Sequence, residues 1–271
     1  MTKSQDLYIL LGGIGKNICF TSCINHLGKI NIMSPWPKVF KNHPNVNFCY
    51  DLEFNPIIDN TNFLNKFSNV ILVEPYDPYF LKNKIHLIKN FRRLCDVNTE
   101  EDIYNEIYFT EQEEDEIQNI VSTLEDYVLV QFIGSDEGQC ETDFVGTRGL
   151  IKKQAQKIVD ILNFDLKLNV LNVFSTDDLL SNTAKIKKTK LDYMNYAHLL
   201  KYAKGFIGID SSLNHMSANK FCDTKGVVLW NDENVIERFS YNKNINLITN
   251  TPRVMRFDVN NIIDNFKKIV G

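Results

Sequence analysis

Short apolar runs alternate with amphipathic segments along nearly the whole chain. The runs with the length and composition of buried strands span residues 7–11, 29–33, 46–50, 70–73, 127–133, 168–174, 205–209, 226–230 and 245–248. Helical patterns fall over residues 17–27, 110–124, 151–162, 192–203, 213–220 and 259–269. Strands that alternate with crossover helices are typical of parallel sheets. The sequence therefore predicts an α/β protein.

The acidic segment 110–124 separates two groups of strands, and its charges are most simply a solvated helix face. After it the strand pattern restarts with residues 127–133. A chain of 271 residues can hold two domains of roughly 100–150 residues each. We expect two Rossmann-like domains, residues 1–122 and 123–271, with parallel sheets facing a central cleft. Ligands of open α/β sheets bind beyond the carboxyl ends of strands, so residues there are the candidates for function.

A glycine-rich turn follows the first strand and includes Gly13, Gly15, Lys16 and Asn17. Glycines allow a tight turn, and the helix N-terminus that follows offers N–H groups to an anion or polar ligand. A dinucleotide fingerprint would need Gly or Ala where this chain has Ile18, and a P-loop would need Ser or Thr where it has Asn17. An ordinary strand–helix turn and a ligand-binding turn both remain open.

A polar segment after strand 205–209 carries the strongest candidate chemistry. It reads Asp210, Ser211, Ser212, Leu213 and then, after Asn214, His215. Either serine can cap the following helix, while neighbouring amides can hold a phosphate. Asp210 is placed to accept hydrogen bonds from sugar hydroxyls. The alternatives are an ordinary helix cap and a hydrogen-bonded packing role for the histidine.

Further candidates lie in loops of the second half. Loop 134–149 contains Ser135 and Arg148, and an arginine at its end could neutralise a leaving diphosphate through paired N–H donors. Thr176 follows strand 168–174 and could contact a base or ribose. A surface role for the arginine and a capping role for the threonine are the simpler interpretations.

Carboxylates follow two strands of the first half. Asp51 and Glu53 come after strand 46–50, and Glu74 and Asp77 come after strand 70–73. Carboxylates at such positions are candidates for a general base. The segment 74–78 is also a natural proline-containing turn.

Composition and charge narrow the class of protein. Thirty basic and 34 acidic residues give a formal net charge of −4, unlike a protein held on nucleic acid mainly by bulk charge. The six cysteines include no CxxC pair, and Cys19 and Cys23 are more simply buried thiols than half a metal site. We find neither a signal peptide nor an apolar run long enough to span a bilayer. A reduced, cytoplasmic enzyme is the expectation.

Taken together and in this order, the segments resemble glycosyltransferase family 9, the heptosyltransferase-like enzymes of GT-B fold. LLGGIGKNICFTSCINHL is similar to the family's N-terminal strand, turn and helix. Residues 193–230, with GFIGIDSSLNH, are similar to its C-terminal signature, and YVLVQFIGS resembles the start of its second domain. The glycine-rich turn and the segment beginning at Trp36 look most like phage-associated members.

The resemblance implies inverting sugar transfer from a nucleotide-diphosphate sugar to a hydroxyl acceptor, without a cofactor. The donor would then be bound by Asp210, Ser211, Ser212, Leu213, His215, Arg148, Ser135 and Thr176. The chain has no convincing DxD motif, in keeping with metal independence. The family usually has an aspartate, the proposed general base, where this chain has Lys16. Asp77 and Glu74 are the candidate replacements.

The acceptor remains open between a saccharide and a 5-hydroxymethylated pyrimidine in phage DNA. An enzyme that extrudes a base would need a basic groove with aromatic side chains. The first half supplies Lys38, Lys41, Lys82, Lys84, Lys89, Arg92 and Arg93, interleaved with Phe40, Tyr79, Phe80 and Phe91. The alternatives to a transferase are a non-catalytic sugar-nucleotide-binding protein and a nucleotide-dependent oxidoreductase.

Overall fold

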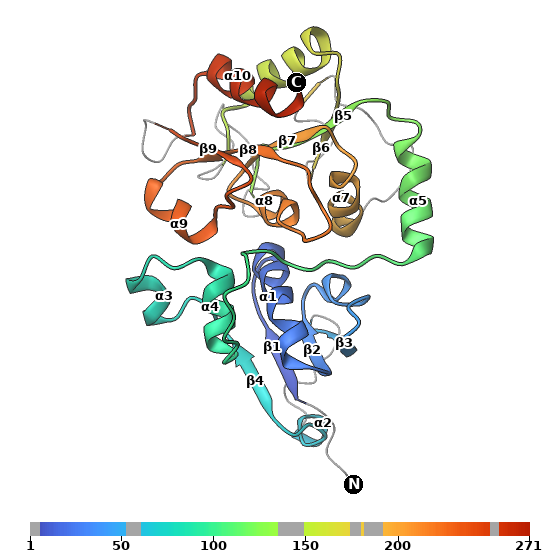
Figure 1. Ribbon diagram of the computed structural model, residues 1–271, viewed down its shortest axis with the longest axis vertical. Helices are drawn as coiled ribbons and strands as arrows, with labels where there is room; N and C mark the ends of the chain where they lie inside the picture. Colours follow the sequence, from blue (N-terminus) through green and yellow to red (C-terminus); the bar gives the residue numbers. More distant parts are fainter. Residues whose placement is uncertain (1–5, 53–60, 135–148, 174–179, 182–191, 250–254) are drawn as a thin grey trace. The chain divides into compact units, whose positions relative to one another are not determined.

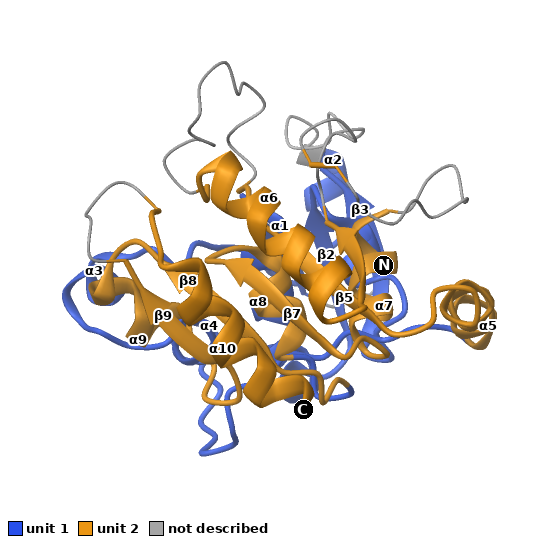
Figure 2. Cartoon of the chain, turned by 90° about the horizontal axis from the view of Figure 1, so that it is seen from above, with its two compact units in different colours: residues 1–110, 219–221 blue, residues 111–218, 222–271 orange. Residues whose placement is uncertain are grey.

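The computed structural model describes residues 6–52, 61–134, 149–173, 180–181, 192–249 and 255–271 (Figure 1). The chain divides into two compact units (Figure 2). Unit 1 contains Met1–Thr110 and the short segment Asn219–Phe221, and unit 2 contains Glu111–Ala218 and Cys222–Gly271. Each unit is built on its own parallel sheet, which confirms the predicted α/β class.

Unit 1 has a four-stranded parallel sheet in the order β3-β2-β1-β4. Its strands are β1 (Leu7–Leu10), β2 (Ile30–Ser34), β3 (Val46–Asp51) and β4 (Val70–Val73). Its helices are α1 (Ile14–Leu27), the 3-10 turn η1 (Pro37–Val39), α2 (Thr61–Leu64), α3 (Pro78–Lys82) and α4 (Leu87–Leu94). The chain runs outward from β1 to β3 and then returns to place β4 on the other side of β1.

Aromatic side chains form much of the core on one face of this sheet, where α1 and α4 pack together. The fully buried Phe20 on α1 meets Phe40 and Phe91 edge-on, with ring centroids 6.3 and 5.6 Å away. Such edge-to-face pairs add to the free energy gained by burying the rings. The other face carries a smaller cluster that includes Met33 and Phe67. These contacts hold the strand ends that carry the candidate residues.

Unit 2 has a five-stranded parallel sheet in the order β6-β5-β7-β8-β9. Its strands are β5 (Tyr127–Gln131), β6 (Asn169–Asn172), β7 (Gly205–Ile209), β8 (Gly226–Trp230) and β9 (Ile245–Ile248). Its helices are α5 (Glu111–Val121), α6 (Lys152–Asp160) with a π-helical extension Ile161–Asp165, α7 (Tyr193–Leu200), α8 (Ser212–Ser217), η4 (Glu233–Val235), α9 (Ile236–Phe239) and α10 (Val259–Val270).

Helices cover both faces of the unit 2 sheet (Figure 1). On one side α6 and α10 bury Ile158 and Phe266 against strand residues such as Ile207. On the other side lie α7 and α8, and α5 packs against α7. A sheet covered on both faces explains why its strands read as continuous apolar runs in the sequence.

All the strands and helices expected from the sequence are present, with bounds shifted by a few residues. The short helices α2, α3, α4 and α9 were not expected. The two compact units meet in sequence between Thr110 and Glu111, ahead of α5, whereas the predicted domain boundary lies near residue 122. Helix α5 packs on α7 in unit 2. There Glu114 bonds to His198 in α7 and to Lys201, the residue that caps the end of α7. The predicted central cleft stays a prediction.

No helix among the described residues is both long and apolar enough to cross a bilayer.

Candidate functional site

The order of strands reverses once in each sheet. In unit 1 the reversal falls between β1 and β4, and in unit 2 it falls between β5 and β7. Loops that leave two such neighbouring strands run in opposite directions and open a crevice at the carboxyl edge, where open α/β sheets bind ligands. The residues that follow these four strands are therefore the candidates for chemistry.

Lys16 and Glu74 meet at the reversal point of unit 1. Lys16 lies in the first turn of α1, after β1, and Glu74 directly follows β4. The Lys16 Nζ donates to Glu74 Oε2 at 2.7 Å. The lysine side chain is only 8% exposed, while that of the glutamate is 48% exposed. The Tyr76 amide donates to Glu74 Oε1 at 3.1 Å. The centroid of the Tyr76 ring lies 5.2 Å from Lys16 Nζ.

The glycine-rich turn is held by polar side chains around it. Gly12 has a φ of +86°, a conformation that favours glycine, and its carbonyl accepts from Trp36 Nε1 at 2.9 Å. The buried Asn17 donates to the Gly13 carbonyl at 3.0 Å and accepts from Ser34 Oγ at 2.8 Å. Asn17, a predicted ligand-contacting residue, thus fixes the backbone of the turn.

Asp77 is engaged in local structure. Its carboxylate caps α3 by accepting from the Phe80 amide at 2.8 Å, and it pairs with Arg93. The guanidinium of Arg93 also lies 4.5 Å from the Tyr79 ring centroid. The backbone hydrogen bond from Phe80, followed by the bonds from Arg93, lowers the pKa of Asp77. These contacts favour a carboxylate that stays ionised and bound.

The other two candidate carboxylates are not brought to this point. Asp51 ends β3, which is separated from β1 by β2. Glu53 lies outside the described residues. Of the predicted bases that the structure describes, Glu74 alone combines a place at the reversal point with a partner from the glycine-rich turn.

A buried glutamine organises the reversal point of unit 2. Gln131, the last residue of β5, is 2% exposed. Its Nε2 donates to Ser211 Oγ at 3.0 Å, and its Oε1 accepts from the Leu213 amide at 3.0 Å. The side chain of Ser211, which was expected to cap α8, makes no cap hydrogen bond. The glutamine takes that capping role, and the Leu213 amide, which was expected to face a diphosphate, is occupied.

Gln131 is a residue that sequence reasoning missed. The signal for it was present, because it is the polar last member of an otherwise apolar strand, YVLVQ. Its partners lie 80 or more positions later in the sequence. Only the pairing of β5 with β7 brings them together.

Asp210 and His215 lie on either side of the start of α8. Asp210 directly follows β7 and is half-buried, at the predicted position beyond the strand end. The His215 ring is buried, and its Nδ1 lies 2.9 Å from the Tyr241 hydroxyl. Burial lowers the pKa of His215 to about 4, so the imidazole is neutral at pH 7. This arrangement matches the packing role that was open for the histidine.

Three further predicted donor contacts, Ser135, Arg148 and Thr176, lie outside the described residues.

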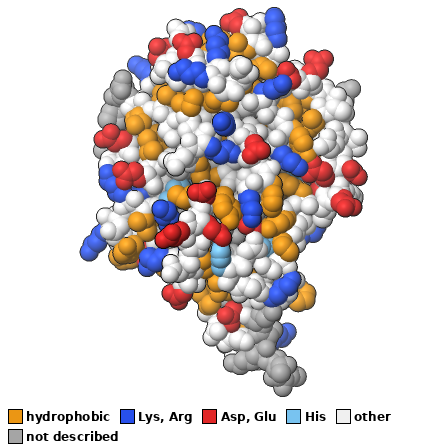
Figure 3. All heavy atoms as spheres, in the orientation of Figure 1, with side chains coloured by type: hydrophobic (Ala, Val, Ile, Leu, Met, Phe, Trp, Pro, Cys, Tyr) orange, Lys and Arg blue, Asp and Glu red, His pale blue; other side chains and the backbone are white. Residues whose placement is uncertain are grey.

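Most aromatic residues considered for a DNA groove are buried, whereas the lysines of the set, Lys38, Lys41, Lys82, Lys84 and Lys89, are exposed. Phe40, Phe80 and Phe91 are buried in the core. Arg92 is also buried and donates to the carbonyls of residues 101 and 102. Figure 3 shows basic and acidic side chains interspersed over the face drawn. Tyr79 is the member of the aromatic set that stays exposed.

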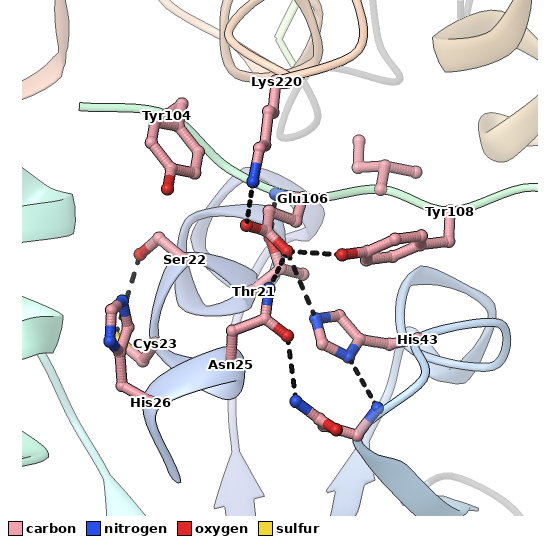
Figure 4. Close-up of polar contacts among 12 residues, drawn as sticks. Thr21, Ser22, Cys23, Asn25, His26, His43, Tyr104, Glu106, Tyr108 and Lys220 are labelled. Atoms are coloured by element: carbon pink, nitrogen blue, oxygen red, sulfur yellow. Dashed lines mark hydrogen bonds and ion pairs between the residues drawn. The ribbon is translucent and has the colours of Figure 1, made fainter. Parts of the chain in front are cut away.

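A second polar cluster in unit 1 surrounds Glu106 (Figure 4). This almost fully buried carboxylate accepts from Asn25, from the Tyr108 hydroxyl at 2.6 Å and from Lys220 Nζ at 3.3 Å. His43 Nε2 lies 3.9 Å away, and burial lowers the pKa of that histidine to about 4. A carboxylate satisfied in this way serves the structure, since buried charges persist where they are paired and hydrogen-bonded. No pattern in the sequence indicates this cluster, because its members come from distant segments of the chain.

Metal ligands do not gather within the described part of the chain, where no group of three or more His, Cys, Asp or Glu side chains could hold an ion. Cys19 and Cys23 are both buried in α1, as the simpler of the two interpretations expected.

Three solved structures that are similar to this chain are glycosyltransferases. A glycosyl transferase of family 9 from Veillonella parvula matches with a TM-score of 0.73 and 12% identity, covering 100% of this chain and 98% of that one. E. coli ADP-heptose lipopolysaccharide heptosyltransferase II matches with a TM-score of 0.71 and 12% identity, covering 98% of each chain. E. coli heptosyltransferase WaaC with ADP matches with a TM-score of 0.64 and 8% identity, covering 98% of this chain and all of that one.

No protein-family model matches the sequence. No curated protein matches it either. The structural similarity extends over both units and shows that the chain has the fold of the family 9 heptosyltransferases, as its sequence resemblance implied.

Proposed function

We propose that this protein is a glycosyltransferase that moves a sugar from a nucleotide-diphosphate donor to a hydroxyl acceptor. The observation that carries the proposal is the full-length match of both sheets to family 9 enzymes, including WaaC solved with ADP and the ADP-heptose heptosyltransferase II. A shared fold alone hosts many chemistries. The polar groups at the two strand-order reversals supply the local support.

The donor is assigned to unit 2. Asp210 lies beyond β7, where its carboxylate can accept hydrogen bonds from sugar hydroxyls, and Ser211 and Ser212 follow it at the start of α8. Gln131 holds both serine hydroxyls in place, at 3.0 and 3.4 Å. Fixed polar groups of this kind are pre-organised for a charged leaving group. The reaction is proposed to invert the anomeric carbon and to need no metal.

The acceptor is assigned to unit 1 and to the saccharide class. The aromatic residues that a base-extruding groove would use are largely buried in the core, and Arg93 is paired with Asp77. A hydroxymethylated pyrimidine in DNA is kept as an outcome of the test.

The test is release of nucleoside diphosphate from a panel of ADP-, GDP- and UDP-sugars, with saccharides, 5-hydroxymethylcytosine DNA or plain DNA as acceptors. We expect release that depends on a saccharide, with a sugar-sized mass gain on the acceptor. Release that depends on the modified DNA would instead reassign the acceptor. Binding of a donor, with no nucleoside diphosphate released in the presence of any acceptor, would support the non-catalytic alternative.

Asp210→Ala tests the donor position. Loss of hydrogen bonds to the sugar should raise the donor KM about tenfold or more, which corresponds to about 1.4 kcal/mol. Asp264→Ala is the matched control, because this carboxylate lies exposed on α10, 4.0 Å from Lys267 of the same helix. An unchanged KM in Asp210→Ala would show that the donor is misplaced.

A further inference from the structure

We propose that Glu74 accepts the proton of the acceptor hydroxyl and that Lys16 is the residue that positions it. The inference rests on the proposed function and goes beyond it by assigning one carboxylate and its partner. It is carried by the ion pair at the β1/β4 reversal point, the position where open α/β sheets bind ligands.

The topology brings the two residues together from 58 positions apart. Strands β1 and β4 are parallel neighbours, with Leu10 paired to Val73 at their carboxyl ends. The next residue after Val73 is Glu74, and Lys16 comes from the helix that follows β1. Both side chains therefore originate at the edge of the sheet where a ligand would bind.

Each carboxylate oxygen of Glu74 is held by one donor. Oε2 accepts from Lys16 Nζ at 2.7 Å, and Oε1 accepts from the Tyr76 amide at 3.1 Å. An ionised carboxylate offers about four acceptor sites, so each oxygen keeps capacity for a substrate hydroxyl. The carboxylate is thus oriented without being saturated.

The burial of the pair is unequal in a way that suits this role. The Lys16 side chain is 8% exposed, whereas that of Glu74 is 48% exposed. Lysine is rarely buried unless it is paired, and a half-exposed ion pair adds little to stability. A purely stabilising role therefore gives a weak reason to bury Lys16, while a role in aiming an accessible carboxylate gives a strong one.

Gly12 lies against this lysine. A Cβ at position 12 would lie 3.4 Å from both Cδ and Nζ of Lys16, at the limit of ordinary van der Waals contact, and it is the φ of +86° that favours glycine there. The ring of Tyr76 lies 5.2 Å from the same Nζ, where a cation–π contact is attractive. The turn and the tyrosine thus bracket the ammonium that faces Glu74.

The proton balance of the step is simple. The acceptor oxygen forms a bond to the anomeric carbon, and the bond from that carbon to the diphosphate oxygen breaks, with its electron pair leaving on the diphosphate. The hydroxyl proton passes to the Glu74 carboxylate. The Lys16 ammonium, which has N–H donors and no lone pair, keeps the carboxyl group in position through its hydrogen bond.

Asp77, the other predicted base, is the rival. One of its oxygens caps α3 and the carboxylate is paired with Arg93, so its contacts are accounted for by local structure. The rival predicts that Asp77→Asn, and not Glu74→Gln, removes the pH dependence described next.

The decisive variant is Glu74→Gln, measured by release of nucleoside diphosphate from the donor and acceptor that the wild-type protein uses. We expect kcat to fall about 100- to 10,000-fold, the range for loss of a general base, with the donor KM within about threefold. The decline of kcat/KM towards acidic pH, which protonation of the carboxylate causes in the wild type, should vanish. Glu74→Asp should keep that decline at a lower kcat.

Lys16→Met should lower kcat while keeping the acidic decline, because the carboxylate is still present but no longer aimed. Glu100→Gln and Lys66→Met are the matched controls, since both side chains are exposed on unit 1. If Glu74→Gln keeps the wild-type kcat and pH profile, the inference is overturned and the proposed function stands. If the wild type turns over no donor, both fail.

Discussion

At the residue scale, His215 shows how burial sets the charge of a side chain. Its pKa is lowered to about 4 by burial, against an ordinary value of 6.5. The unfolded chain therefore takes up a proton between these values that the folded chain does not. The free energy of unfolding should fall as the pH drops from about 6.5 towards 4, by about 3 kcal/mol for this one group.

His215→Asn should make the pH dependence of stability shallower, because the titrating group is gone. The measurement is the free energy of unfolding in urea between pH 7.5 and 4.5. The readout is the slope of this free energy against pH, because the smaller side chain lowers stability at every pH and leaves the slope unaffected. His26→Asn is the control, as that imidazole is 30% exposed. An unchanged slope in His215→Asn would mean that the imidazole is not neutral in the folded protein.

Single residues also explain why the sequence could not predict the site. Lys16 and Glu74 were both named from the sequence, but their pairing depends on β4 lying beside β1 and not beyond β3. The role of Gln131 likewise depends on strand order, because its partners reach it only when β7 lies beside β5. Local pattern identifies strand ends well, while the order of strands is decided by packing across the whole unit.

At the element scale, α5 keeps the solvated acidic face that its sequence predicts at Glu111, Asp115 and Glu116 and departs from it at one residue. Glu114 turns inward and lies 2.6 Å from Nε2 of the buried His198 and 3.1 Å from Lys201 Nζ. Burial alone raises the pKa of Glu114, but the hydrogen bonds from His198 and Lys201 outweigh it and leave the pKa below its ordinary value. One residue of an acidic run therefore fixes the helix to α7.

Glu114→Ala should destabilise unit 2 by about 1–3 kcal/mol, because the His198 ring nitrogen loses its partner in a buried setting. The midpoint of denaturant unfolding measures the change. Asp115→Ala, the adjacent exposed carboxylate of the same helix, should shift it by less than about 0.5 kcal/mol. Equal shifts in the two variants would show that Glu114 belongs to the solvated face after all.

The helices that the sequence did not predict are shorter than most of those that it did. The strands and long helices carry enough apolar residues for their period to be read, and all were found. Helix α3 has five residues and depends on the cap from Asp77, and α4 starts from a cap by His86. Such helices depend on one side-chain contact and on packing. Neither can be recognised from the periodicity of apolar residues in the sequence.

At the scale of the whole molecule, the fold is retained at 8–12% identity to solved family 9 structures. What both units share is a parallel sheet with a single reversal of strand order and polar side chains joined across it. The two reversal points predict different ligands, since unit 2 offers Asp210 beside two serine hydroxyls, whereas unit 1 offers Glu74 paired with Lys16.

ADP, the nucleotide with which the similar heptosyltransferase WaaC was solved, provides the test of this division. At 100 times its Kd it should raise the free energy of unfolding by about 2.7 kcal/mol. Hydrogen exchange should slow in β7 and α8, whereas the core amides of β1 and β2 should keep their rates. Slower exchange confined to the unit 1 strands would reverse the assignment of donor and acceptor.

Gln131→Met should weaken ADP binding about tenfold or more, because Ser211 and Ser212 lose the amide that orients their hydroxyls and the Leu213 amide loses its acceptor. Gln118→Met, an exposed glutamine on α5 of the same unit, should leave the Kd within about twofold. Calorimetric titration of both variants measures the difference. If both bind ADP as the wild type does, the reversal point of unit 2 is a structural junction and the donor binds elsewhere.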